Sequence, residues 1–127
     1  MKAHDLRRFT VLLLLASLTF GKAASLNDLT YHSRTDHIVI TDCDTFANGV
    51  LIIPAQIEGK AVTIIADQAF QGCRRLEAIQ LPSSIILIGD CAFQGCLALT
   101  SFTLMSGVES IGSEAFWGTA LNSPEQP

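Results

Sequence analysis

The segment DCAFQGC at residues 90–96 has a near-copy, DQAFQGC, at residues 67–73, and a weaker copy, SEAFWGT, at residues 113–119. Successive copies begin 23 residues apart, and other apolar positions recur with the same interval. The equivalent positions include three phenylalanines and three isoleucines: Phe70, Phe93 and Phe116, and Ile65, Ile88 and Ile111. A fixed period of this length is typical of a solenoid, in which each coil buries its apolar side against its neighbours. We therefore expect these two sets of side chains to form ladders through the core.

Each repeat also predicts the elements of one coil. The segments LEAIQL (76–81) and LTSFTL (99–104) end in the alternation of a strand, with Gln80 and Thr103 facing outward. A second extended piece is expected around 85–88 and 108–111. The fold class that follows is mostly β: a short solenoid of 23-residue coils with parallel strands.

The seven-residue copies predict the corner of each coil as one helical turn. Asp67, Asp90 and Ser113 suit the N-cap of such a turn. The glycines that follow suit a left-handed exit from it, and they are Gly72, Gly95 and Gly118.

Residues 24–61 depart from the period and are expected to form an N-terminal cap on the repeats of residues 62–119. Within this cap, VLIIP (50–54) aligns with IQLP (79–82), which places Leu51 beside Ile79. The segment HIVITDCD predicts a strand, ANG predicts a hairpin-like turn, and Ile57-Glu58-Gly59 predicts a turn at the edge.

The opposite end shows no equivalent cap. After Trp117-Gly118 the sequence continues as TALNSPEQP, and two prolines are incompatible with the interior of a regular strand. The tail folds back, a partner covers the last coil, or the chain is a shortened form of a longer protein, and we favour the third alternative. Residues 120–127 are expected to be disordered.

The N-terminus predicts export. A basic start is followed by an apolar run from Phe9 to Phe20, and Gly21 and Ala23 suit a signal-peptidase site. The alternative is an uncleaved anchor, although the run is short for a bilayer span. Cleavage after Ala23 removes four basic residues and one acidic residue, which changes the net charge from −4 to −7. This acidic balance argues against nucleic acid as a partner.

The segments LPSSIILIGDCAFQGCLALTSFTL (81–104) and SGVESIGSEAFWGT (106–119) are similar to the repeating unit of a known family. Over residues 28–119 the chain resembles the BspA-type leucine-rich repeats of bacterial and protist surface proteins. It departs from that pattern at Ala66, where glycine is usual, at Met105 in place of proline, and in the final strand. The resemblance implies an exported, non-enzymatic solenoid that binds host or matrix proteins or acts in adhesion, with no catalytic residues to carry over.

Four cysteines in an exported chain raise the question of disulfides. Cys73 and Cys96 share a column of adjacent coils, where parallel side chains give poor disulfide geometry, and buried thiols are favoured over a bond. Cys91 shares a column with Gln68 and Glu114 and is expected to be exposed. A bond from Cys43 to Cys91 would need the cap to wrap far around the repeats, and we do not expect it.

Metal and catalytic sites are not predicted, and neither is a cofactor. Asp42 and Asp44 alternate as in a calcium loop, but no acidic residue closes that loop. His32, Asp36 and His37 with Cys43 match no standard zinc spacing, and a polar edge strand explains them better. No histidine follows residue 37, so a hydrolytic triad would have to bridge the cap and the repeats.

The remaining candidate is a surface. The outward residues of the main strands form a candidate binding face, with Ile52, Gln80 and Thr103 in one row and Val50, Ala78 and Ser101 beside it. Arg74, Arg75 and Trp117 are further exposed candidates. Two functions follow: a module that binds an extracellular or surface protein, or a glycan, through this face, and a repeat unit that works only by stacking on a partner or another protomer through its C-terminal edge. An ordinary solvated face remains the alternative to both.

Overall fold

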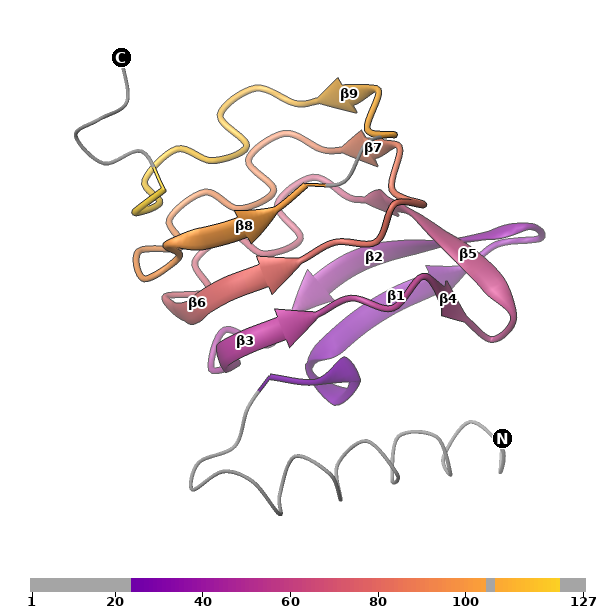
Figure 1. Cartoon of the computed structure of the whole chain (residues 1–127), viewed down its shortest axis with the longest axis horizontal. Coiled ribbons are helices and arrows are strands. Elements are labelled where there is room, and N and C mark those ends of the chain that lie inside the picture. Colours follow the sequence, from indigo (N-terminus) through magenta and orange to yellow (C-terminus); the bar gives the residue numbers. More distant parts are fainter. Residues whose placement is uncertain (1–23, 105–106, 122–127) are drawn as a thin grey trace.

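The computed structural model describes residues 24–104 and 107–121, which form a stack of coils (Figure 1). Its elements are a short 3-10 helix, η1, and nine strands. Their bounds are η1 Leu26–Asp28, β1 Leu29–Ser33, β2 His37–Cys43, β3 Asn48–Ile52, β4 Gln56–Ile57, β5 Lys60–Ile65, β6 Arg75–Gln80, β7 Leu87–Ile88, β8 Ser101–Thr103 and β9 Ser110–Ile111. The expected mostly β architecture is confirmed.

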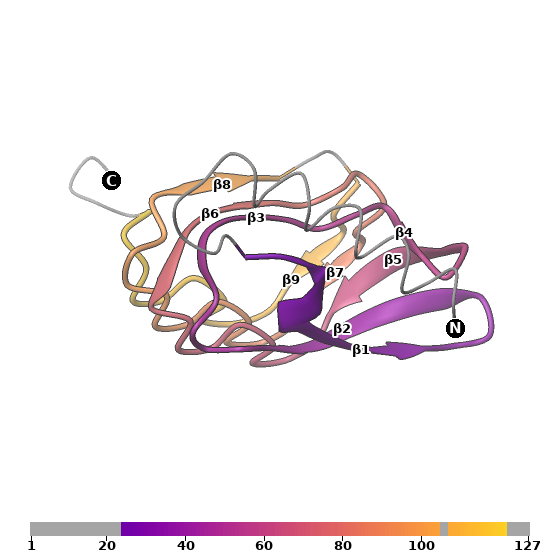
Figure 2. The same cartoon turned by 90° about the horizontal axis from the view of Figure 1, so that it is seen from below.

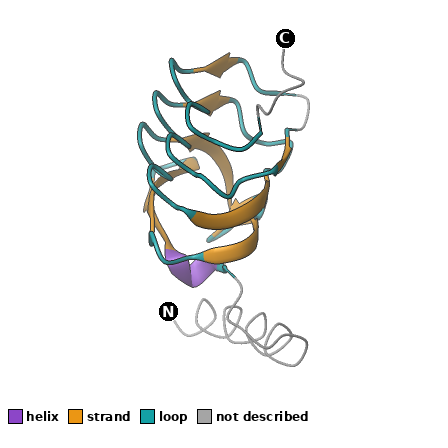
Figure 3. Ribbon diagram, turned by 90° about the vertical axis from the view of Figure 1, so that its left-hand side faces the viewer, coloured by secondary structure: helices purple, strands orange, loops and turns teal. Residues whose placement is uncertain are grey.

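The strands form two sheets on opposite sides of the stack (Figure 2). One sheet has the order β1-β2-β5-β7-β9, with β4 paired to β5, and the other has the order β3-β6-β8. The pairs β2–β5, β5–β7 and β7–β9 are parallel, as are β3–β6 and β6–β8. Figure 3 shows these strands piled one above the other, with loops joining the two sheets.

The predicted ladders run through the space between the sheets. Ile65 pairs with Ile88, and Ile88 with Ile111, in the strand register. The Phe70 and Phe93 rings stack with centroids 4.9 Å apart, and the Phe93 and Phe116 rings with centroids 5.3 Å apart. The core is thus built by equivalent residues of successive coils, because each coil alone would leave its apolar side in water.

The corners differ from the sequence prediction, because they are successive β-turns rather than helical turns. Gln68, Cys91 and Glu114, at the second position of each copy, have φ of 62°, 57° and 57°. A positive φ is incompatible with a right-handed helical turn and breaks it at its start. The left-handed exit is confirmed, since φ at the three glycines Gly72, Gly95 and Gly118 is 77°, 78° and 81°.

The expected N-cap aspartates bond between coils instead of within one turn. The Asp67 carboxylate accepts the backbone N–H of Asp90 at 2.8 Å, and the Asp90 carboxylate accepts that of Ser113 at 2.9 Å. A glycine precedes each donor: Gly89 precedes Asp90, and Gly112 precedes Ser113. A Cβ added to Gly89 would lie 2.8 Å from the Ala66 carbonyl carbon, so the glycine lets consecutive corners approach closely.

The N-terminal region already contains a coil of the solenoid. Leu51 pairs with Ile79 as predicted, and both β2 and β3 run parallel to the strands of the next coil. The hairpin-like turn expected at ANG is wrong, because β2 and β3 belong to different sheets and the loop between them is another corner. The edge turn is confirmed: Glu58 and Gly59 join β4 to β5 with positive φ.

At the C-terminal end, the chain starts a further turn along the last coil. The Ala120 N–H donates to the Leu99 carbonyl at 3.1 Å, and Leu121 packs on the core. These two residues, at the start of the predicted tail, are half-buried. Residues 122–127, Met105 and the predicted signal peptide lie outside the described residues. Within the described ranges, no helix has the length and apolar character needed to cross a membrane.

Candidate functional site: the strand face

The three-stranded sheet brings the predicted binding residues together in two rows. We call the outward side of β3, β6 and β8 the strand face. Its first row pairs Ile52 with Gln80 and Gln80 with Thr103, and its second row pairs Val50, Ala78 and Ser101 in the same way. Side chains alternate across a strand, so the intervening Leu51 and Ile79 point into the core while these two rows face outward.

The strand face changes character from one end to the other. In β3, Ile52 is 62% exposed and Val50 is 49% exposed. In β6, Gln80 is exposed and Ala78 is half-buried, and in β8 the residues are the small and polar Ser101 and Thr103. Neither row contains a charged side chain. The apolar end of the face is therefore β3, the edge strand of its sheet.

A further exposed aromatic residue lies beside this apolar end. Phe46, in the corner before β3, is 66% exposed, and the Arg75 guanidinium lies 5.1 Å from the centre of its ring. This contact links the first corner to the start of β6 and adds an aromatic group and a charge to the margin of the face. The sequence did not indicate an exposed Phe46, because the following ANG predicted a hairpin-like turn at this corner.

The other exposed candidates lie apart from the strand face. Trp117, in the last corner, is 67% exposed, and Arg74 is exposed beside Arg75. On the opposite side of the stack, Ile86 and the following Leu87 of β7 are 41% and 38% exposed. These residues are separate from the two rows above and do not extend them.

All four cysteines lie within the described residues, and each is a free thiol. Cys73 and Cys96 are buried as expected, and burial raises the pKa of the Cys96 thiol to about 12. Cys91 is half-buried rather than exposed. Cys43 is buried at the end of β2, where the Cys73 thiol lies 3.9 Å from its carbonyl oxygen, and nothing in the sequence pattern indicated this proximity.

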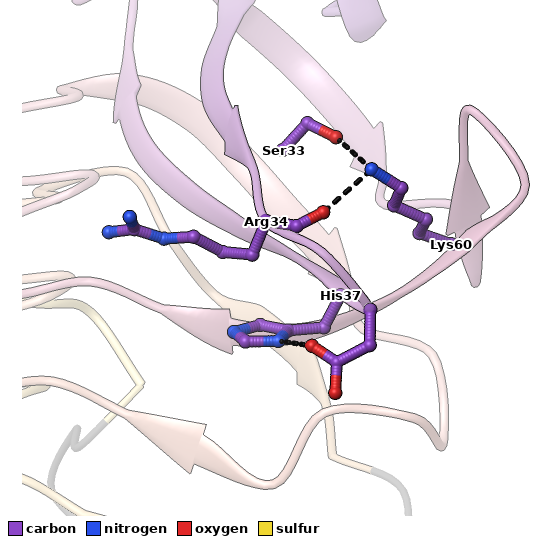
Figure 4. Close-up of polar contacts among 5 residues, drawn as sticks. Ser33, Arg34, His37 and Lys60 are labelled. Carbon is purple, nitrogen blue, oxygen red and sulfur yellow. Dashed lines mark hydrogen bonds and ion pairs between the residues drawn. The ribbon is translucent and has the colours of Figure 1, made fainter.

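Among the described residues, His32 lies on β1, and His37 begins β2 after the hairpin (Figure 4). His37 Nδ1 is 2.7 Å from Asp36 Oδ1, and this hydrogen bond lowers the pKa of the Asp36 carboxyl. Lys60 Nζ donates to Ser33 Oγ at 2.8 Å and to the Arg34 carbonyl at 2.6 Å, which ties the hairpin to β5.

The other residues considered as metal ligands lie away from His37 or form hydrogen bonds within the corner. Cys43 lies at the other end of β2 from His37. The Asp44 carboxylate accepts the Phe46 N–H at 2.9 Å, so it shapes the corner. The described residues contain no group of three or more side chains suited to hold a metal ion.

Stacked parallel coils with a two-row strand face define a leucine-rich repeat solenoid. Residues 40–127 match the family described as the BspA type leucine rich repeat region (6 copies). The chain therefore belongs to the BspA-type leucine-rich repeat family.

Two solved structures are similar to this chain. The leucine rich repeat protein of Treponema pallidum (TpLRR) is 33% identical with a TM-score of 0.69, over 76% of this chain and 46% of that one. A leucine rich cell surface protein of Faecalibacterium prausnitzii is 23% identical with a TM-score of 0.61, over 79% of this chain and 29% of that one. The chain thus matches less than half of either protein's length. A search of the curated proteins found no match.

Proposed function

We propose that this chain is an exported, non-enzymatic interaction module that binds an extracellular or cell-surface protein through its strand face. Membership of a repeat family and the similarity to a cell surface protein support this class of function. The acidic balance of the sequence after cleavage at Ala23 is consistent with a protein partner and disfavours nucleic acid.

The observation that carries the proposal is the exposed apolar end of the strand face. Val50 and Ile52 lie side by side on β3, uncharged and largely exposed, with Phe46 nearby. Apolar side chains gathered on a regular surface gain free energy when a partner removes them from water. The polar residues of β6 and β8 supply hydrogen-bonding groups next to this apolar end, an arrangement typical of protein interfaces.

The test is a binding measurement of the purified chain against a panel of immobilised extracellular-matrix proteins. Ile52→Lys places a charge in the centre of the proposed contact, so it should weaken binding about tenfold or more. Ile86→Lys is the matched control, because it changes the same residue type on the opposite side of the molecule and should leave affinity unchanged. Equal loss in both variants would refute the strand face as the binding surface.

A second panel of immobilised glycans addresses the other ligand class. Binding to glycans alone, lost in Ile52→Lys and kept in Ile86→Lys, would keep the surface but replace protein with carbohydrate as the ligand. Binding to neither panel would count against the proposed function as an interaction module.

The last coil favours a second candidate, stacking through the C-terminal edge. Among the described residues, β8 and β9 end their sheets, and Leu104, Ile111 and Trp117 are 43%, 46% and 67% exposed. A second copy or another repeat protein that stacked here would bury these side chains.

Sedimentation at increasing concentration distinguishes the two candidates. Stacking predicts oligomers that dissociate with Thr103→Lys or Trp117→Asp, whereas Ile52→Lys, at the other end, should leave them intact. A monomer at all concentrations that still binds a matrix protein would support the module alone.

A further inference from the structure

Two buried cysteines meet where the N-terminal strands join the first repeat. Cys43 is the last residue of β2, and Cys73 directly follows Gly72, at the end of the corner between β5 and β6. Their side chains are 3% and 0% exposed. Although 30 residues separate them in the sequence, the two coils that carry them are neighbours in the stack.

Both thiols converge on one carbonyl group. Cys43 Sγ lies 3.6 Å from the Asp44 carbonyl oxygen, and Cys73 Sγ lies 3.9 Å from the same atom and 3.9 Å from the Cys43 carbonyl oxygen. Cys96 Sγ is committed elsewhere, because it donates to the Phe70 carbonyl at 3.0 Å. The Cys73 thiol is therefore directed back toward β2.

The two side chains also affect each other's ionisation: hydrogen bonding between them lowers the pKa of Cys73 and raises the pKa of Cys43. The thiolate is the nucleophile in thiol chemistry, and the lowered pKa favours Cys73 as the attacking residue.

We propose that Cys43 and Cys73 form a disulfide that joins β2 to the first repeat. The oxidant is a disulfide, either of low molecular weight or carried by a thiol oxidoreductase. The Cys73 thiolate attacks one of its sulfurs, forms a mixed disulfide and releases the first thiolate. Cys43 then loses its proton and attacks the Cys73 sulfur, so the protein disulfide forms and a second thiolate leaves. The two protein thiols are oxidised as one external disulfide is reduced to two thiols.

This bond would fasten the N-terminal end of the solenoid. It closes the loop from residue 43 to residue 73 and so restricts the unfolded chain. Because both sulfurs are buried, the oxidant reaches them before the coils have closed or during local opening. In the cell the reaction depends on the proposed export into an oxidising compartment, but the test below uses purified protein and does not depend on export.

Trypsin cleavage sites separate the candidate pairings. Cleavage at Arg34, Lys60, Arg74 and Arg75 places Cys43 in peptide 35–60, Cys73 in peptide 61–74, and Cys91 and Cys96 together in peptide 76–127. The full chain is refolded with oxidised glutathione, its free thiols are alkylated in denaturant, and it is digested without reductant.

The proposal predicts that peptides 35–60 and 61–74 appear as one linked species that reductant separates. A link between 61–74 and 76–127 would show a Cys73 bond to the other repeat cysteines and would overturn it. Full alkylation of Cys43 and Cys73 would overturn it as well.

Thermal unfolding gives an independent readout. Oxidation should raise the melting temperature by about 10 °C or more, and reductant should reverse the change. Cys43→Ala should abolish this response to reductant, whereas Cys96→Ala, a buried cysteine of the next coil, should retain it. The response is read within each variant, so a lower starting stability does not obscure it. Loss of the response in Cys96→Ala alone would contradict the pairing.

Discussion

The middle coil and the last coil carry the same residues in different surroundings. Phe93 stacks between two phenylalanine rings and is fully buried, whereas among the described residues Phe116 stacks on the Phe93 ring alone and is half-buried. Ile88 and Ile111 differ in the same way, with 1% and 46% of their surfaces exposed. The contribution of a repeat residue to stability is thus set by its neighbours in the stack rather than by its own repeat.

The two ends of the stack also differ from each other. At the N-terminal end, the Ser25 N–H donates to the Asp28 carboxylate at 2.9 Å, and the Ser25 hydroxyl accepts the Asn27 N–H at 3.3 Å. This capping box starts η1, which leads into β1 at the edge of the six-stranded sheet. The last coil instead exposes apolar side chains among the described residues. The N-terminal end thus includes a hydrogen-bonded cap at Ser25–Asp28, whereas the described last coil exposes apolar side chains on which another coil could stack.

The largest effect is expected when the phenylalanine ladder is cut in the middle. Phe93→Ala removes a ring packed on both faces and should lower the free energy of unfolding by about 3–5 kcal/mol, and Phe116→Ala by about half as much. Chemical denaturation followed by circular dichroism measures both. If Phe93→Ala does not fold, Phe93→Leu and Phe116→Leu provide the same comparison. Equal losses at the two positions would contradict the dependence on neighbours.

A smaller effect is expected from the close approach of the corners. A Cβ at Gly89 would press on the backbone of Ala66 and Asp67, so Gly89→Ala should cost about 1–3 kcal/mol. Gly72 has open space around it but a φ of 77°, and Gly72→Ala should cost about 1 kcal/mol from backbone strain alone. The same denaturation experiment compares the losses of unfolding free energy in the two variants. A smaller loss for Gly89→Ala than for Gly72→Ala would show that the corners can move apart.

The N-terminal capping box is expected to contribute about 1 kcal/mol. Ser25→Ala removes the hydroxyl that accepts the Asn27 N–H, and the loss should fall in the usual range for an N-cap. Thr45→Ala, at an exposed position in the first corner, serves as the control and should change stability little. Amide hydrogen exchange of β1 checks whether the loss is local: faster exchange confined to residues 25–33 is expected, and uniform acceleration would argue against a separate cap.

The smallest effect is expected at the exposed corner of the last coil. Trp117→Ser should change the free energy of unfolding by no more than about 0.5 kcal/mol at low protein concentration, because 67% of the side chain is already in water. A large loss at low concentration would mean that Trp117 supports the fold of the last coil. A loss that grows with concentration would instead point to stacking between copies.

Much of the architecture could be predicted, because the constant interval between repeats indicates which residues lie in contact in neighbouring coils. Residues 23 apart must lie in register if each coil is to bury its apolar side, and Ile65, Ile88 and Ile111 do so. The two rows of the strand face follow from the same register with strand alternation. The role of that face stays a prediction, since position does not identify a ligand.

The sequence predictions were wrong at a segment that has no copy in the other repeats, and at corners whose shape is decided by the backbone angle φ. Nothing in the identities of Gln68, Cys91 and Glu114 indicates a left-handed φ, so the corners were expected to be helical. The corner after Cys43 departs from the repeating sequence, so it resembled a hairpin and hid both the exposed Phe46 and the proximity of Cys43 to Cys73.

The sequence alone determined which residues share a column and which of them face the core, because a constant interval and strand alternation are properties of a single chain. The tertiary structure decided how the corners turn, which sheet each N-terminal strand joins and which thiols meet. Those outcomes depend on how tightly neighbouring coils approach each other, and that distance is set by packing between segments far apart in the sequence.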